Sequence, residues 1–202
     1  MHTLWSEIYG NERAVEIEIG SGTGTFLLAA AAQRPGINFL GLEHSYGRAR
    51  RVQAVLDECG PSNVRLVCAD AACVVTTLIP DDSVAAYHVY FPDPWWKRRH
   101  HRRRLFTPSF VAALARTLAP GGRLFIATDV DDTFALMVEA VATCAALKPD
   151  AFLRSPRARV TSFERKGLAR GATIKEATFV KQAGARFHAS SAAPMTPAES
   201  PS

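Results

Sequence analysis

Acidic side chains stand at or just after the ends of three predicted β-strands, at Glu18, Glu43 and Asp70. One acid at such a place is typical of a helix cap or a surface charge. Three acids at successive strand ends indicate a shared binding site instead, because the carboxyl ends of parallel strands meet at one edge of a sheet. A carboxylate there can accept hydrogen bonds from ribose hydroxyls or bind a cationic group, and Asp70 can accept a hydrogen bond from the exocyclic amine of adenine.

A glycine turn follows the first of these acids, with Gly20, Gly22 and Gly24 at alternate positions. This spacing is a weak signal by itself, and it differs from the G-x-G-x-x-G of nicotinamide-binding folds. Glu18, just before the glycines, would repel a pyrophosphate but attract an ammonium or sulfonium group. Glu43 suits the ribose of either adenosine cofactor. The charges therefore favour S-adenosyl-L-methionine over a dinucleotide.

Asp93 lies between two prolines and beside two tryptophans, directly after a predicted strand at 84–90. The prolines restrict the backbone, so the acid is presented on a stiff loop. An aromatic ring beside a carboxylate suits an unstacked nucleobase. The alternative is a purely structural proline turn whose aromatic rings pack into the core.

Positive charge is concentrated in residues 97–104, where six of eight side chains are Lys or Arg and the other two are His100 and His101. The whole chain carries a net charge of +5, so the charges outside this cluster nearly balance. Such a density repels itself, and phosphate groups would relieve that repulsion. We therefore predict nucleic-acid contact rather than a solvated loop.

The elements that must position these residues alternate along the chain. Strands are predicted at 14–19, 38–43, 64–68, 84–90 and 122–127, and helices at 25–33, 47–59, 72–79, 108–118 and 131–147. This alternation predicts an α/β fold with a doubly wound, mostly parallel sheet. Two further strand-like pieces within 161–181 predict an antiparallel hairpin at the sheet edge.

The length of 202 residues and a hydrophobic content of 48% predict one folded domain. We expect a short leader at 1–13, the folded domain at 14–186 and a disordered Ala/Ser/Pro-rich tail at 187–202. The longest apolar run is far shorter than the roughly 20 residues of a membrane span, and no export signal opens the chain. We therefore expect a cytoplasmic protein without membrane contact. The four cysteines form no C-x-x-C pair, which predicts reduced, mostly buried thiols and no metal site.

The sequence resembles the bacterial tRNA (guanine-N7-)-methyltransferases, the TrmB family, in four motifs that occur in the same order and spacing. These motifs are 18–24, 91–104, 127–129 and 161–167. The match covers residues 4–181. The Phe-Pro-Asp-Pro-Trp block followed by a basic cluster is highly specific, whereas the glycine turn is shared with class I methyltransferases at large.

The resemblance implies a Rossmann-like, seven-stranded class I methyltransferase fold, and methyl transfer from S-adenosyl-L-methionine to N7 of a guanosine in the variable loop of tRNA. It implies a cofactor site at Glu18, Gly20, Gly22, Gly24, Glu43, Asp70 and Asp93, with Asp93 also as the catalytic residue. It implies substrate contacts at Lys97, Asp129, Thr161, Ser162, Phe163 and Glu164. Contacts with the tRNA backbone would fall on Arg99, His100, His101, Arg102, Arg103 and Arg104, in a monomer or homodimer.

Two alternatives stay open. One is a methyltransferase that uses the same cofactor cleft on a protein or a small metabolite, and the basic cluster argues against it. The other is a non-catalytic RNA-binding protein on the same fold. The intact acids argue against that protein, because a scaffold has no physical need for unpaired carboxylates around a cleft.

Overall fold

The computed structural model describes residues 3–93, 105–151, 156, 171 and 173–184. Its helices are α1 (Leu4–Tyr9), α2 (Thr25–Gln33), α3 (Tyr46–Cys59), α4 (Ala71–Thr77), α5 (Pro108–Thr117) and α6 (Asp131–Ala142). Its strands are β1 (Val15–Ile19), β2 (Asn38–Glu43), β3 (Val64–Cys68), β4 (Val84–Tyr90), β5 (Leu118–Thr128), β6 (Leu147–Pro149) and β7 (Lys175–Lys181). In this part of the chain no helix has the length and apolar character that a membrane span requires.

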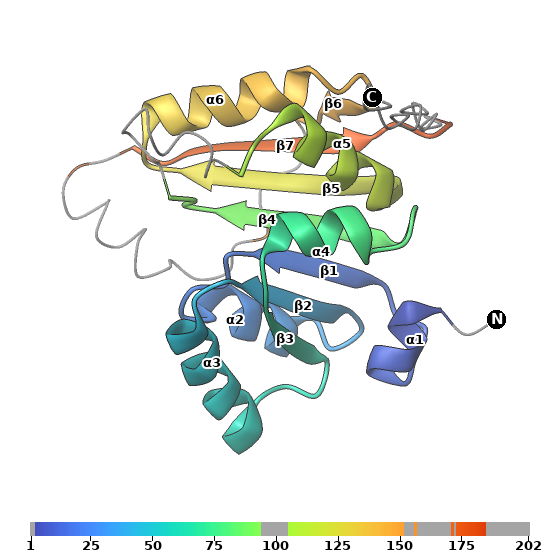
Figure 1. Cartoon of the computed structure of the whole chain (residues 1–202), viewed down its shortest axis with the longest axis vertical. Coiled ribbons are helices and arrows are strands. Elements are labelled where there is room, and N and C mark those ends of the chain that lie inside the picture. The colour runs from blue at the N-terminus through green and yellow to red at the C-terminus, as the bar shows by residue number, and fades with distance from the viewer. Residues whose placement is uncertain (1–2, 94–104, 152–155, 157–170, 172, 185–202) are drawn as a thin grey trace, which may run out of the picture.

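The strands of the described chain form one seven-stranded sheet in the order β3-β2-β1-β4-β5-β7-β6 (Figure 1). Strands β1 to β5 run parallel, and β7 runs antiparallel to both β5 and β6. The strand order reverses between β1 and β4, the place where open α/β sheets bind ligands outside the carboxyl ends of their strands. The prediction of a doubly wound, mostly parallel sheet with an antiparallel edge is confirmed.

Apolar side chains fill both faces of the sheet. Helices α4, α5 and α6 cover one face, and buried residues such as Val75 and Leu114 pack there against Tyr87 of β4. Helix α2 covers the other face through Phe26 and Leu27. Helix α1, which the sequence did not predict, joins the first of these cores through Trp5, whose indole N–H donates to the carbonyl of Ser83 at 2.8 Å.

The antiparallel edge differs from the prediction in the origin of its outer strand. The helix predicted at 131–147 ends at Ala142, and Leu147 begins β6 opposite Lys181 of β7. Leu147 is only 4% exposed, because its side chain fills the core beneath this edge. That burial outweighs the helical preference of the local sequence. The prediction placed two strand-like pieces within 161–181, and of this range the structure describes only 171 and 173–181, where β7 lies.

Strand β5 is longer than predicted. The predicted strand at 122–127 begins earlier, at Leu118, because a register shift beside Ala86 lets β5 continue through two glycines.

The prediction of mostly buried cysteines is wrong, since Cys59, Cys68 and Cys73 are exposed and all four thiols are free. Cys68 is exposed because it ends β3, the outermost strand of the sheet on that side.

Candidate functional site

The glycine turn after β1 needs glycine at each of its three alternate positions. Gly20, Gly22 and Gly24 have φ values of 79°, 55° and 72°, which side chains with a Cβ rarely adopt. A Cβ on Gly24 would also lie 2.8 Å from a methyl group of Val52 in α3. A Cβ on Gly20 would meet no atom within 4 Å. The turn is therefore packed against α3 on one side and open at Gly20.

Glu18 lies at the end of β1 with a buried, unsatisfied carboxylate oxygen. The residue is 5% exposed, and its Oε2 accepts no hydrogen bond within the described part of the chain. Burial raises the pKa of Glu18 to about 8, with a further contribution from the negative charge of Glu43, although hydrogen bonding from Ser21 and from the backbone of Leu27 acts in the opposite direction. A cationic ligand group would supply the missing partner and favour the ionised carboxylate.

Glu43, at the end of β2, holds the glycine turn in place. Its Oε2 accepts the N–H of Gly22 at 2.8 Å, and its Oε1 accepts the N–H of Ser45 at 2.8 Å. The Nε of Arg48 lies 3.4 Å from the same Oε1. Glu43 thus connects the turn after β1 to the start of α3 and keeps its carboxylate in one orientation.

Asp70 follows β3 and is the N-cap of α4. Its Oδ1 accepts the N–H groups of Ala72 at 2.7 Å and Cys73 at 3.1 Å. The cap that the sequence analysis weighed against a ligand role is therefore present. Because a carboxylate has two oxygens, the cap still leaves Oδ2 as an acceptor toward the cleft, and contact with adenine stays a prediction.

The turn that carries Asp93 begins with an uncommon backbone conformation. Strand β4 ends at Tyr90, and Phe91 has a φ of 50°, in the left-handed region. Its N–H donates to the carbonyl of Ala127 in β5 at 2.8 Å, which fixes the turn to the neighbouring strand. Non-glycine residues in this conformation concentrate at functional sites. Asp93, two residues later, is exposed.

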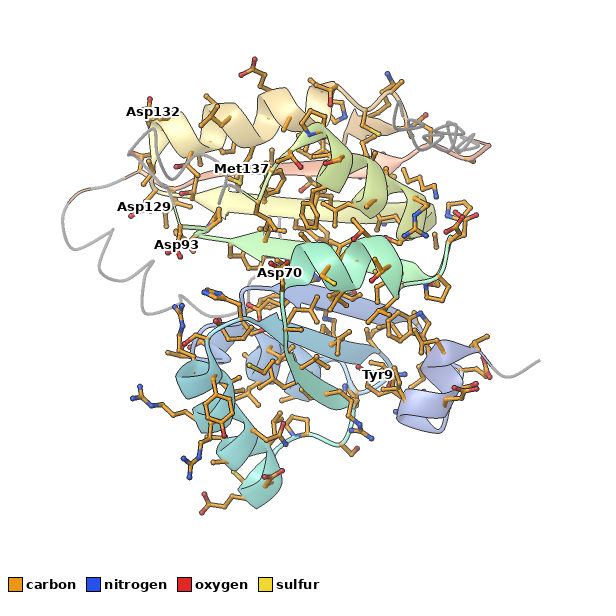
Figure 2. All side chains as sticks on the ribbon, in the orientation of Figure 1. Tyr9, Asp70, Asp93, Asp129, Asp132 and Met137 are labelled. Carbon is orange, nitrogen blue, oxygen red and sulfur yellow. The ribbon has the colours of Figure 1, made fainter. Side chains whose placement is uncertain are left out.

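A cavity of about 860 Å³ lies over these strand ends. Six predicted site residues line it, namely Glu18, Gly20, Gly22, Glu43, Asp70 and Asp93. The described lining does not include Gly24, which packs against α3, or Asp129. Figure 2 shows Asp129 at the same edge of the molecule as Asp93, after the next strand, β5. The structure therefore gathers six of the seven predicted cofactor residues around one cleft.

The remaining predicted contacts lie outside the described residues. They are Lys97, Arg99, His100, His101, Arg102, Arg103, Arg104, Thr161, Ser162, Phe163 and Glu164. Their roles toward substrate and tRNA stay predictions.

A buried polar chain that was not predicted from the sequence reaches the cleft on the α2 face of the sheet. Arg34 donates to Oε1 of Glu16 at 2.6 Å, and Oε2 of Glu16 lies 2.8 Å from Nε2 of His88. Nδ1 of His88 lies 2.8 Å from the hydroxyl of Tyr90, a residue of the cleft lining. The ring of His88 also stacks on Phe125, with 5.1 Å between ring centroids.

This polar chain has a defined protonation state. Burial lowers the pKa of His88 in spite of the nearby Glu16 carboxylate. Burial alone would raise the pKa of Glu16, but His88 and Arg34 outweigh it and hold that pKa below its ordinary value. Because a carboxylate only accepts, a neutral His88 donates from Nε2 and accepts the Tyr90 hydroxyl at Nδ1. Alternation alone places Glu16 with Glu18 on one face of β1 and His88 with Tyr90 on one face of β4. Only the register between β1 and β4 brings the two pairs to the same face of the sheet.

Comparison with known proteins shows the family. Residues 12–177 match the family described as "Putative methyltransferase". The chain is 41% identical over 174 residues to the tRNA (guanine-N(7)-)-methyltransferase of Bordetella pertussis, covering 85% of this chain and 68% of that protein. It is 37% identical over 181 residues to the protein of the same name from Paraburkholderia xenovorans, covering 88% and 70%.

Solved structures support the fold. The 16S rRNA methyltransferase KamB has a TM-score of 0.65 at 17% identity, covering 88% of this chain and 92% of that one. The 16S rRNA (adenine(1408)-N(1))-methyltransferase of Catenulisporales acidiphilia, a W203A mutant solved with its cosubstrate SAM, has a TM-score of 0.61 at 15% identity, covering 91% and 92%. Because its sequence matches these relatives over most of its length and its fold agrees with that match, this chain belongs to the tRNA (guanine-N(7)-)-methyltransferase family.

Proposed function

We propose that this chain transfers the methyl group of S-adenosyl-L-methionine to N7 of a guanosine in tRNA, forming 7-methylguanosine. The observation that carries the proposal is a single cleft lined both by Glu18, whose buried Oε2 has no hydrogen-bond partner among the described residues, and by Asp93 on its fixed turn. The names of the relatives support tRNA as the substrate. The proposal includes the variable loop as the methylated region and, because the substrate is tRNA, the cytoplasm as the place of reaction.

The residues of the cleft suit the cofactor. Oε2 of Glu18 can accept a hydrogen bond from the ammonium group in the methionine part of the cofactor, because this oxygen is buried and has no partner in the described chain. Each oxygen of Glu43 accepts one backbone N–H and keeps capacity for a ribose hydroxyl. The open space at Gly20 allows the cofactor to approach the backbone closely. When bound, the cofactor supplies a methyl carbon made electrophilic by the adjacent sulfonium.

The protein does not need a strong base for this reaction. N7 of guanine has an in-plane lone pair and carries no proton at neutral pH, so the nucleophile is already free. Catalysis then depends on holding the base against the methyl group, and such positioning can remove a large part of a barrier. A turn fixed to the neighbouring strand by the Phe91 amide is suited to this task.

Asp93 and Asp129 are proposed to hold the guanine and to stabilise its charge. The purine becomes cationic as the methyl group arrives, and nearby carboxylates stabilise that developing charge. The two acids follow neighbouring parallel strands whose pairing joins Tyr90 to Ala127. We assign Asp93 as the catalytic residue and Asp129 to another edge of the base.

The basic segment is proposed to contact the tRNA backbone. Lys97 and the residues 99–104 follow the Asp93 turn directly in the sequence, so phosphates bound there would lie close to the target guanosine. Thr161 to Glu164 complete the proposed substrate contacts. The support for these assignments is the charge of the segment and its family resemblance.

Nucleoside analysis tests the proposal. The purified protein is incubated with unmodified tRNA and methyl-labelled cofactor, and the tRNA is digested and separated by mass spectrometry. Labelled 7-methylguanosine is expected, and strand cleavage after borohydride and aniline treatment should place it in the variable loop. Label in another nucleoside, in protein or in a small metabolite would overturn the proposal, as would tRNA binding without any label transfer.

A further inference from the structure

A second group of basic side chains lies beside the cleft, on and just before the first two turns of α3. It consists of His44, Arg48, Arg50 and Arg51, together with the aromatic Tyr46, and is called the α3 basic face below. Tyr46 is 72% exposed, and Arg50 and Arg51 are also exposed. Helix α3 packs along β3 and β2, so this face lies at the end of the sheet opposite β6.

The order of charges along α3 is unfavourable for the helix alone. Its first half carries three arginines, whereas its second half carries Asp57 and Glu58. The helix dipole favours the reverse order, with anions near the N-terminus and cations near the C-terminus. Arg48 and Arg51 are also three residues apart, a spacing at which like charges repel. This arrangement destabilises the free helix slightly, and a bound polyanion would reverse that effect.

The exposed arginines are not used by the described part of the protein. Arg48 lies 3.4 Å from the carboxylate of Glu43 and is half-buried. Arg50 and Arg51 form no ion pair with any described residue. Two guanidinium groups are therefore available to phosphate oxygens, which they bind with good geometry.

The face is continuous with the cleft. His44 and Arg48 both line the cavity that holds Glu18 and Asp93. A polynucleotide with its target base in that cavity would extend over the neighbouring surface. The bare ring of Tyr46 is positioned there to stack on an unpaired base, a common mode of RNA recognition.

We propose that the α3 basic face is a tRNA docking surface in addition to residues 97–104, with Arg50 and Arg51 on phosphates and Tyr46 against an unpaired base. This inference rests on the proposed function, because it takes tRNA as the partner. A cation pair and an exposed ring beside the cleft suit a single-stranded or looped region of RNA next to the modified guanosine. The face therefore orients the tRNA from the side opposite the antiparallel edge.

Charge removal on the face tests the proposal. The double variant Arg50→Gln/Arg51→Gln is compared with Arg13→Gln/Lys148→Gln, which removes two exposed charges at the opposite, amino-terminal edge of the sheet. tRNA binding is measured by fluorescence anisotropy at several salt concentrations. The salt slope is the steepness with which the logarithm of the binding constant falls with the logarithm of the salt concentration. Loss of two phosphate contacts should lower this slope by about 1.4 to 1.8, which corresponds to a roughly 25- to 60-fold higher Kd at 0.1 M salt.

Kinetics and a second pair of variants separate docking from damage to the fold. Arg50→Gln/Arg51→Gln should raise KM for tRNA while leaving kcat and the Kd for the cofactor unchanged, because neither side chain lines the cleft. Tyr46→Phe should bind tRNA like the wild type, whereas Tyr46→Ala should bind more weakly. Equal binding by Tyr46→Phe and Tyr46→Ala would remove the stacking role.

The outcomes distinguish this inference from the proposed function. If the wild-type protein forms 7-methylguanosine and both double variants show the same salt slope and KM, the α3 basic face is not a docking surface. If the wild type binds tRNA without methylating it, the proposed function fails, and the two salt slopes still decide the inference. If the wild type does not bind tRNA, both are overturned.

Discussion

Replacing Glu18 by glutamine tests the electrostatics of the cleft directly. In the ligand-free chain the pKa of Glu18 is raised from 4.5 to about 8, first by burial and then by Glu43. A carboxyl group with a raised pKa in the folded state stabilises the fold fully below pH 4.5. This contribution is lost progressively as pH rises toward 8, because the unfolded chain gives up its proton more easily.

The expected magnitude follows from the two pKa values. At pH 7 the carboxyl group is protonated in the folded chain but ionised in the unfolded chain, because its unfolded pKa lies about 2.5 units below this pH. Keeping the proton in the folded state therefore costs roughly 3 kcal/mol of folding stability. Glu18→Gln keeps the size and hydrogen-bonding capacity of the protonated acid and removes this penalty. The variant should therefore be more stable by up to about 3 kcal/mol at pH 7, or roughly 6 to 12 °C in Tm for a domain of this size.

Denaturant unfolding of the ligand-free proteins between pH 4.5 and 8.5 is the assay. The two stability curves should meet near pH 4.5 and separate as pH rises. Glu58→Gln, at an exposed position in α3, is the matched control and should follow the wild type. Equal pH dependence in Glu18→Gln and wild type would refute the argument that burial raises the pKa of Glu18.

Cofactor binding should favour the wild type over Glu18→Gln, in contrast to the stability of the ligand-free proteins. The ammonium of the cofactor favours the ionised carboxylate, so binding at pH 7 should release about 0.9 proton from the wild type. Calorimetry in two buffers of different ionisation enthalpy measures this release. Glu18→Gln should bind the cofactor more weakly and release no proton, and proton release equal to that of the wild type would assign the titration to another group.

Four further variants test the proposed site and its support. Asp93→Ala should lower turnover on tRNA roughly 10²- to 10³-fold while cofactor affinity changes much less, and unchanged turnover would remove Asp93 from the reaction. Neutralising Arg102, Arg103 and Arg104 to glutamine should lower the salt slope of tRNA binding by about 2 to 3, and an unaltered slope would exclude this segment from docking. His88→Leu should destabilise the fold by roughly 2 kcal/mol in urea unfolding, because it removes a partner of the buried Glu16. His88→Gln should recover part of that loss, and equal stability of the two variants would show that the hydrogen bond contributes nothing.

The layout of the cleft could be predicted because it depends on local signals. The alternation of strands and helices implied parallel strands whose carboxyl ends meet, so Glu18, Glu43, Asp70 and Asp93 had to converge. Helix α5 begins at Pro108 as predicted, since proline at a first helical position loses no hydrogen bond. These features depend on a few neighbouring residues and on one rule of sheet topology.

The partners and the protonation of the site required the folded chain. Glu16 meets His88 across 72 positions of sequence, and Glu43 holds the amide of Gly22 across 21. No periodicity specifies such pairs, because they depend on which strands become neighbours and on the registers they adopt. The pKa of Glu18 likewise depends on the water that surrounding elements exclude. Residue spacing thus determined where the acids gather, whereas long-range packing determined which of them are hydrogen-bonded and which one keeps a buried oxygen without a partner among the described residues.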